Sequence, residues 1–286
     1  MRPLEIRRLS HALGAEVMGV DLSRPLDADT VGALDALWDE HLVLLFRGQD
    51  IRPDDHLAFT RRFGTPTLFP NNNLEGYPEI LRVTNRSING KPSNTRNTGR
   101  NWHSDHTWTD APAKGSLLRC VERPEVGGDT LFTNLGLAYE TLSPKLREIV
   151  DGLEAVHDYN LIAGLDVRDP VYVAEMKRRY PPVVHKCVQV HPGTGRRFLF
   201  VGDRVRTFVG MTEEESQPLL RLLVRHATRA EFTYRHAWRV GDLMMWQNLY
   251  TMHFAPADFD QSQPRDMHRT TLKGEKTGYP WVAPAA

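Results

Sequence analysis

The sequence lacks the features that mark several large classes of protein. Only two cysteines, Cys120 and Cys187, occur among 286 residues. Two are too few for a disulfide framework or a zinc knuckle, so we expect two reduced thiols in the core. No apolar run approaches membrane-spanning length, and none follows the basic residues at the N-terminus as a secretory signal would require. We therefore expect a cytoplasmic protein that does not contact membranes.

Neither sign of charge is in surplus. The chain has 36 Lys and Arg against 36 Asp and Glu, so the formal net charge is zero. Phosphate binding needs a basic surplus or a basic face, so we expect no nucleic-acid partner. A neutral chain gives little repulsion between copies, which favours self-association, and we expect a homo-oligomer.

Sequence repeats, low-complexity linkers, Gly-rich phosphate loops and G-x-S-x-G elbows are also missing. Their absence argues against repeat, nucleotide-binding and serine-hydrolase folds. Hydrophobic residues make up 40% of the chain, which is enough for a sizeable core. We expect one domain over residues 1–286.

Helix signals occur at four places. Asp27 or Asp29 can cap a helix, and Pro53 can begin a second. Ser143 followed by proline predicts a third, and the capping box TEEE from Thr212 predicts a fourth.

Short β-type runs prevail elsewhere. The first is HLVLLFRGQ at 41–49, ended by Gly48, and the others follow residue 102: GSLLRCVE, GDTLFTNL, RRFLFVGD, GDLMMWQN and HRTTLKG. Many short strands with polar turns predict a sandwich or small barrel, with helices outside it. Residues 71–101 are instead rich in Asn, Gly, Ser, Arg and Thr, which predicts a mobile loop. It is either a simple surface loop or a lid over the motif that follows it.

The motif WHSDHTW at 102–108 holds the sharpest chemical signal. If this segment is extended, His103 and Asp105 lie on one face and can bind one metal ion. By itself, H-x-D is weak evidence, and the tripeptide alone favours an exposed His–Asp hydrogen bond over a metal site. His253, far along the chain, offers a third ligand. Two histidines and one carboxylate on one side of a metal leave positions open for O₂ and a co-substrate.

Two arginines follow His253 on an expected strand. Arg265, Met267 and Arg269 alternate and therefore share a face. Inside a barrel the two guanidinium groups would need anions, whereas on an outer face they would be solvated. Period-two alternation does not decide between these alternatives.

These blocks resemble the TauD/TfdA family of Fe(II)/2-oxoglutarate dioxygenases. Its W-H-[ST]-D block is similar to residues 102–105, its G-G-D-T block to residues 127–130, and its distal block to residues 251–271. GAEVMGVDLSRPL and FRGQ are also similar, so the resemblance extends from Gly14 to Gly274. The stretches HSDHTWTDAPAKGSLL and DQSQPRDMHRTT look closer to aryloxyalkanoate dioxygenases of the TfdA type.

The resemblance implies a mainly β fold, a double-stranded β-helix (jelly roll) core with surrounding helices. It implies that iron is bound by three metal ligands: His103, Asp105 and His253. It implies 2-oxoglutarate chelated to that iron, with Arg265 and Thr130 on its far carboxylate, and Arg269 on the substrate. The bidentate fork of an arginine suits a carboxylate in a way that lysine cannot copy.

The implied reaction is hydroxylation of a small anionic organic substrate by O₂, with release of succinate and CO₂. An aryloxyalkanoate-like carboxylate is favoured, because Phe69 appears where taurine enzymes carry a histidine. Alternatives within the family are an alkylsulfonate or sulfate-ester dioxygenase and a biosynthetic hydroxylase of an amino-acid-like substrate. Outside it stand a zinc hydrolase and a non-catalytic jelly roll that binds an anion.

Three further positions carry expectations. The family's W-D-N-R becomes Trp246, Gln247, Asn248 and Leu249, which affects packing and not the ligands. His106 should face away from the site or lie just outside it. His157 either lines the pocket or is a satisfied core histidine.

Overall fold

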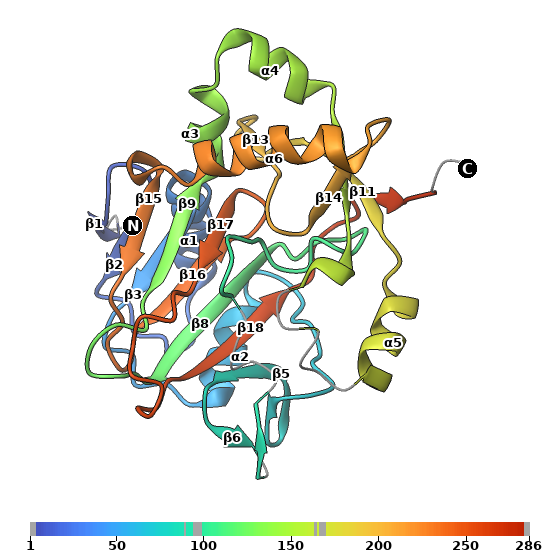
Figure 1. Ribbon diagram of the computed structural model, residues 1–286. Coiled ribbons are helices and arrows are strands. Elements are labelled where there is room, and N and C mark those ends of the chain that lie inside the picture. The colour runs from blue at the N-terminus through green and yellow to red at the C-terminus, as the bar shows by residue number, and fades with distance from the viewer. Residues whose placement is uncertain (1–3, 89, 94–98, 163–164, 166–169, 283–286) are drawn as a thin grey trace.

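The chain folds mainly into β-strands with helices packed around them (Figure 1). The structure is a computed structural model that describes residues 4–88, 90–93, 99–162, 165 and 170–282. Its helices are α1 (Ala28–His41), α2 (Pro53–Arg61), α3 (Leu135–Glu140), α4 (Pro144–Asp151), α5 (Pro170–Arg179) and α6 (Glu213–Ala227), with short 3-10 turns at Tyr159–Leu161 and Ala230–Phe232. The expectation of a mainly β protein with surrounding helices is confirmed.

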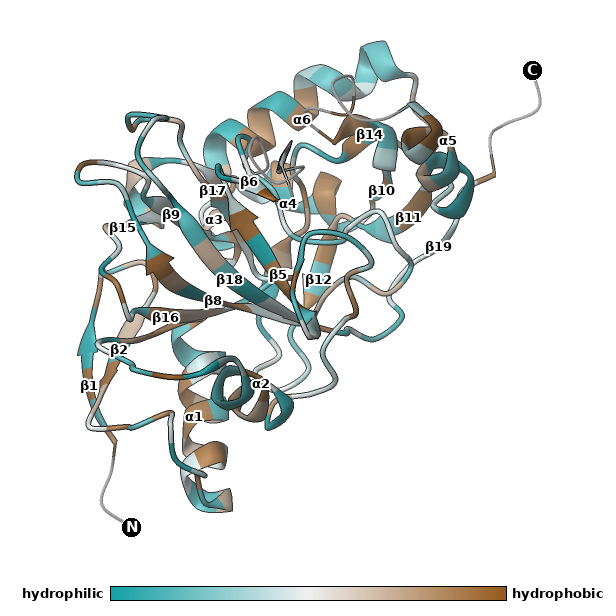
Figure 2. Cartoon of the chain, turned by 90° about the horizontal axis from the view of Figure 1, so that it is seen from below, coloured by the Kyte–Doolittle hydropathy of each residue, from teal (hydrophilic) through white to brown (hydrophobic). Residues whose placement is uncertain are grey.

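Two sheets form the centre of the molecule. The larger has the strand order β1-β2-β3-β16-β8-β18-β5-β4, and the smaller has the order β15-β9-β17. The larger consists of β1 (Glu5–Arg8), β2 (Ala15–Met18), β3 (Val43–Phe46), β4 (Asn73–Leu74), β5 (Tyr77–Thr84), β8 (Gly115–Glu122), β16 (Leu243–Gln247) and β18 (Asp266–Leu272). The smaller consists of β9 (Thr130–Asn134), β15 (Thr233–His236) and β17 (Thr251–Phe254). Helices α1 and α2 cover one face of the large sheet, and β9 and β17 lie over the other (Figures 1 and 2).

The central strands are apolar on both faces because both faces are covered. In β16, Met245 belongs to the apolar cluster that contains Trp38 of α1. Its neighbour Trp246 points the other way and meets Phe132 of β9, with ring centroids 5.4 Å apart. Successive side chains of a strand alternate between faces. The strand β16 therefore packs against α1 on one face and against the small sheet on the other.

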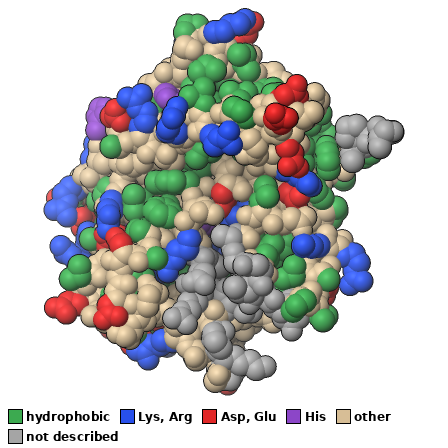
Figure 3. Space-filling view, viewed as in Figure 1, with side chains coloured by type: hydrophobic (Ala, Val, Ile, Leu, Met, Phe, Trp, Pro, Cys, Tyr) green, Lys and Arg blue, Asp and Glu red, His purple; other side chains and the backbone are tan. Residues whose placement is uncertain are grey.

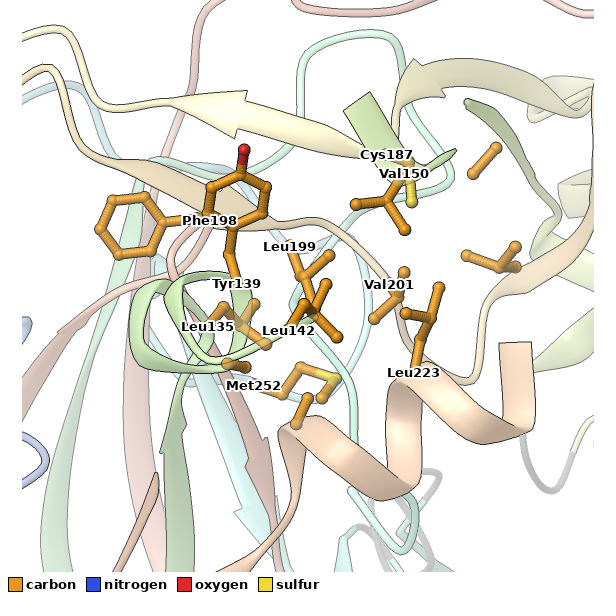
Figure 4. Close-up of a cluster of buried hydrophobic side chains, with 14 of the residues drawn as sticks. Leu135, Tyr139, Leu142, Val150, Cys187, Phe198, Leu199, Val201, Leu223 and Met252 are labelled. Atoms are coloured by element: carbon orange, nitrogen blue, oxygen red, sulfur yellow. The ribbon is translucent and has the colours of Figure 1, made fainter. Parts of the chain in front are cut away.

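A further apolar core lies beneath α6. It packs against the sheet β14-β10-β11-β19, and Figure 4 shows Leu135, Leu199, Leu223 and Met252 converging in it. The strands not yet given are β10 (Glu154–His157), β11 (Val183–Lys186), β14 (Val205–Phe208) and β19 (Tyr279–Pro280), and the pairs β12 (Val188–Val190) with β13 (Arg197–Leu199) and β6 (Ser87–Ile88) with β7 (Lys91–Pro92). Met252 precedes His253 on β17, so this core fixes the strand that presents the imidazole.

The predicted helix starts are confirmed. Asp27, rather than Asp29, caps α1 and accepts a hydrogen bond from Thr30 N. Ser143 caps α4, and Thr212 forms the expected capping box with Glu215 at the start of α6. Each cap satisfies backbone N–H groups that a helix leaves free at its first turn.

The expectation of one irregular loop over residues 71–101 is wrong for the middle of this range. The eight-residue strand β5 lies there and pairs with β18 along Asp266–Arg269. Ile80 of β5 is fully buried, so this polar stretch still supplies a strand to the large sheet. Residues 89 and 94–98, on which the lid interpretation depends, lie outside the described residues.

The surface shows charges of both signs. On the face in Figure 3, basic and acidic side chains are interspersed, with apolar side chains between them. In the described part of the chain, no helix combines the length and the apolar character that crossing a bilayer requires.

Candidate metal and co-substrate site

His103 and His253 are brought together by backbone pairing. Each donates its N–H to the carbonyl of the other, at 3.1 and 2.8 Å, in an isolated antiparallel bridge. The two ring centroids are consequently 4.1 Å apart. The predicted extended segment is limited to this bridge, because residues 105–108 form a turn. Pairing with β17, rather than alternation along one strand, therefore sets the geometry.

Asp105 is held in that turn by a buried amide. The Asn248 side chain accepts from Asp105 N at 2.6 Å and donates to Asp105 O at 2.8 Å. The carboxylate itself accepts a hydrogen bond from Ser116 of β8 at 2.9 Å. Arg269 of β18 donates to its two oxygens at 3.0 and 3.2 Å. Backbone and carboxylate of Asp105 are thus both fixed before any ligand binds.

The charges at this position suit a cation. Burial opposes ionisation of Asp105, but Arg269 and the two imidazoles outweigh it and lower the carboxyl pKa. Burial lowers the pKa of His103 to about 4, helped by His253, and burial likewise lowers the pKa of His253 to about 4. At neutral pH the three groups are therefore one carboxylate and two neutral imidazoles, the protonation states that metal ligation requires.

The three side chains fit a divalent metal ion. All are buried, and one ligand atom from each lies within 4.8 Å of the others. His103 Nδ1 lies 2.7 Å from the carbonyl of Asn101. A carbonyl can only accept, so Nδ1 carries the proton and Nε2 keeps the lone pair that binds metal. Among the described residues no other group of three such side chains lies this close.

Arg265, directly before β18, is also buried. Its Nε donates to the Gly128 carbonyl at 2.8 Å, and its NH2 is 3.5 Å from the Thr130 hydroxyl. That hydroxyl also accepts from Trp238 Nε1 at 3.0 Å, which leaves its own proton available. No carboxylate in the described part of the chain forms an ion pair with Arg265. Burial lowers the Arg265 pKa to about 10, so the guanidinium stays charged and lacks an acid of its own.

Comparison with known proteins shows the family of the chain. Residues 5–271 match the family described as "Taurine catabolism dioxygenase TauD, TfdA family". The chain belongs to the TauD/TfdA family. The α-ketoglutarate-dependent 2,4-dichlorophenoxyacetate dioxygenase of Cupriavidus pinatubonensis is 35% identical over 90% of this chain and 93% of its own. The α-ketoglutarate-dependent sulfate ester dioxygenase of Pseudomonas putida is 35% identical over 95% and 90%.

A solved structure agrees with this family assignment. The crystal structure of AAD-2 in complex with Mn(II) and N-oxalylglycine has a TM-score of 0.87 at 31% identity, and covers 96% of this chain and 99% of its own. The resemblance seen in the sequence blocks is therefore confirmed as membership of the TauD/TfdA family.

Sequence reasoning missed several residues that support this TauD/TfdA site. Asn248 was noted only as part of an altered motif, yet it fixes the Asp105 backbone, and its identity within Trp246–Leu249 was the available signal. Ser116 gave no signal, because its role depends on β8 passing beside the Asp105 turn.

His106 lies beside the site with its ring against Phe69 and Trp108, at centroid distances of 6.4 and 5.4 Å.

His157 is a buried histidine without polar contacts. It stacks on Phe200 and meets His185 edge-on, each at a centroid distance of 5.1 Å. Within the described part of the chain, neither of its ring nitrogens has a hydrogen-bond partner. The alternative of a satisfied core histidine is therefore only half right, since the ring is in the core but not satisfied.

Proposed function

We propose that this protein is an Fe(II)- and 2-oxoglutarate-dependent dioxygenase whose iron ligands are His103, Asp105 and His253. The observation that carries the proposal is the buried set of two neutral imidazoles and one carboxylate within 4.8 Å. The names of the relatives support the co-substrate, since they are α-ketoglutarate-dependent dioxygenases. Such a set leaves iron positions open, as non-haem oxygenases require.

Bound iron and 2-oxoglutarate supply the oxidising power, as O₂ is reduced and 2-oxoglutarate becomes succinate and CO₂. The protein's own residues hold the iron and 2-oxoglutarate, orient the substrate and exclude water. Asn248 and Ser116 fix Asp105, and the pairing of His103 with His253 fixes the imidazoles. A site built on paired strands keeps such ligands in place with little reorganisation.

Arg265 and Thr130 fit the far carboxylate of 2-oxoglutarate. The guanidinium is buried, charged and without an acid, and the hydroxyl beside it can donate. N-oxalylglycine, bound in the related AAD-2 structure, has the same two carboxylates as 2-oxoglutarate with one CH₂ replaced by NH. A dicarboxylate would supply the anion that a buried guanidinium needs.

We also propose that the fold is a double-stranded β-helix, that the chain is a single domain, and that it forms a homo-oligomer. The two sheets enclose the site, with His253 from the small sheet and Arg269 from the large one, as in a double-stranded β-helix. One family match from residue 5 to 271 supports a single domain over residues 1–286. A homo-oligomer stays a prediction from the neutral net charge, and light scattering of the purified protein tests it.

The primary substrate is a small organic anion that binds to Arg269. Iron and the two arginines together exceed Asp105 and the 2-oxoglutarate dianion by one positive charge. Asp129 and Asp258 form their ion pairs with Arg235 and not with Arg269. Arg269 contacts Asp105 through NH1, while its buried Nε has no hydrogen-bond partner among the described residues. An aryloxyalkanoate carboxylate is favoured, and a sulfate ester is the second candidate, because one relative carries each activity in its name.

A substrate panel tests the proposal. Each acid is paired with its neutral amide or ester, and succinate formation is measured with Fe(II) and 2-oxoglutarate. The wild-type protein should turn over acids and leave neutral analogues almost untouched, and Arg269→Gln should lose that preference. Preference for neutral or cationic substrates would exclude the anion assignment.

Activity with zinc in place of iron would support a hydrolase, and unaltered turnover in Asp105→Ala would exclude the metal assignment.

A further inference from the structure

The turn formed by Gly127 and Gly128 lies against the segment that joins β17 to β18. Both glycines have positive φ, at 76° and 71°, where other residues are strained. A Cβ on Gly127 would lie 2.3 Å from the carbonyl oxygen of Asp258. The glycines therefore allow the two backbones to approach closely, and they bring the Asp258 side chain to the turn.

The peptide groups of Gly128 are held from both sides. Its N–H donates to Asp258 Oδ1 at 3.2 Å. Its carbonyl accepts from Arg265 Nε at 2.8 Å. One glycine thus connects the carboxylate of Asp258 with the guanidinium proposed to bind 2-oxoglutarate.

Asp258 is itself held by a second ion pair. Its Oδ2 accepts from Arg235 NH2, and Arg235 Nε donates to Asp129 Oδ2 at 2.7 Å. Arg235 lies on β15 and Asp129 directly precedes β9, so the pairs join the small sheet to the β17–β18 segment. Two carboxylates share one guanidinium, which leaves a surplus negative charge near Arg265.

We propose that Asp258 is a positioning residue for the co-substrate, because through Gly128 it sets the direction of the Arg265 guanidinium. Arg235, supported by Asp129, fixes the Asp258 carboxylate in turn. The inference rests on the proposed function of Arg265. It assigns 2-oxoglutarate affinity to an ionic group that touches neither iron nor co-substrate.

The arrangement differs from an ordinary surface ion pair. Such pairs contribute about 0–1 kcal/mol and affect no particular ligand. Here the Arg235 side chain is 52% exposed, but the Asp258 carboxylate also satisfies a backbone N–H. Among the described residues, the Arg265 side chain has only one other hydrogen bond, the long one to Thr130. Loss of the Gly128 restraint should therefore weaken 2-oxoglutarate binding more than it affects other properties of the protein.

Calorimetry on the Mn(II)-loaded protein measures this directly, with 2-oxoglutarate as the titrant. Asp258→Ala should weaken 2-oxoglutarate binding about 3- to 30-fold, because the part-buried Gly128 N–H loses its acceptor. Asp258→Asn keeps an oxygen for Gly128 N–H and should stay within about 3-fold of wild type. The matched control is Asp260→Ala in the same segment, because the Asp260 side chain bonds only Ser262 and should change nothing.

Two further measurements separate positioning from general damage. Mn(II) affinity without 2-oxoglutarate should be unchanged in all variants, and with Fe(II) the KM for 2-oxoglutarate should rise while the KM for the primary substrate does not. Should Asp258→Ala fail to fold, Arg235→Gln carries the test, with an expected 2-oxoglutarate affinity about 2- to 5-fold below wild type.

The inference is overturned if Asp258→Ala binds 2-oxoglutarate within 2-fold of wild type, or if Asp258→Asn is as impaired as Asp258→Ala. Equal loss of Mn(II) affinity would also overturn it, and so would unchanged binding in Arg235→Gln where that variant carries the test. Failure of the wild-type protein to bind 2-oxoglutarate would instead exclude the proposed function.

Discussion

Single side chains at this site combine burial with charge. Asp105 is 4% exposed and Arg265 is 9% exposed, yet each is charged. Asp105 is supported by Arg269 and Ser116, whereas the Arg265 side chain, among the described residues, donates only to neutral oxygens. A buried charge without an opposite charge is costly, so the residue that still needs one indicates where a ligand binds.

Arg265→Gln should therefore raise the KM for 2-oxoglutarate far more than the KM for the primary substrate. Truncating one partner of a buried charge pair costs about 2–5 kcal/mol, or roughly 30- to several-thousand-fold in affinity. Thr130→Val removes one neutral donor and should cost about 1 kcal/mol. Steady-state kinetics with each substrate varied in turn provides the measurement. An unchanged KM for 2-oxoglutarate in Arg265→Gln would exclude its role.

At the scale of elements, the site depends on strands that are distant in sequence. β17 presents His253, β18 presents Arg269, and β8 presents Ser116. Helix caps were predictable because they depend on neighbouring residues, as at Thr212. The strand β5 was not, because its polar sequence becomes a strand only through pairing with β18. The grouping of His103, Asp105 and His253 was predictable from motif and resemblance. The position of Ser116 and the pairing of His103 with His253 arise from the fold.

The Asp105 turn offers a direct test at this scale. Asn248→Ala removes the side chain that holds both backbone groups of Asp105, so Mn(II) affinity should fall about 10- to 100-fold. Gln247→Ala is the matched control, because the Gln247 amide bonds Asp39 and does not touch the turn. Both variants should lose stability, but only the first should lose metal. Equal metal affinity in the two proteins would show that Asn248 does not support the site.

For the whole molecule, buried histidines set the response to acid. Burial lowers the pKa of His56 to about 3 and those of His103 and His253 to about 4, and it lowers the pKa of His157 as well. Such residues bind fewer protons folded than unfolded. Their stabilising contribution is complete above their unfolded pKa of about 6.5 and is lost as the pH falls toward 4.

The free energy of unfolding of the metal-free protein should fall by about 2–5 kcal/mol between pH 7.5 and pH 5. Guanidinium denaturation at several pH values measures it. His157→Phe should make the decline shallower, because the ring has no hydrogen bond to lose and stacks on Phe200. A pH profile identical to wild type in that variant would contradict this account of His157.

The most direct test of the central claim is an anaerobic titration followed by visible absorption. Chelation of Fe(II) by 2-oxoglutarate produces a charge-transfer band that neither component gives alone. The wild-type protein should show this band only with both present, and Asp105→Ala should not show it at concentrations that saturate wild type. Absence of the band from the wild-type protein, or an equal band in Asp105→Ala, would contradict an iron site at His103, Asp105 and His253.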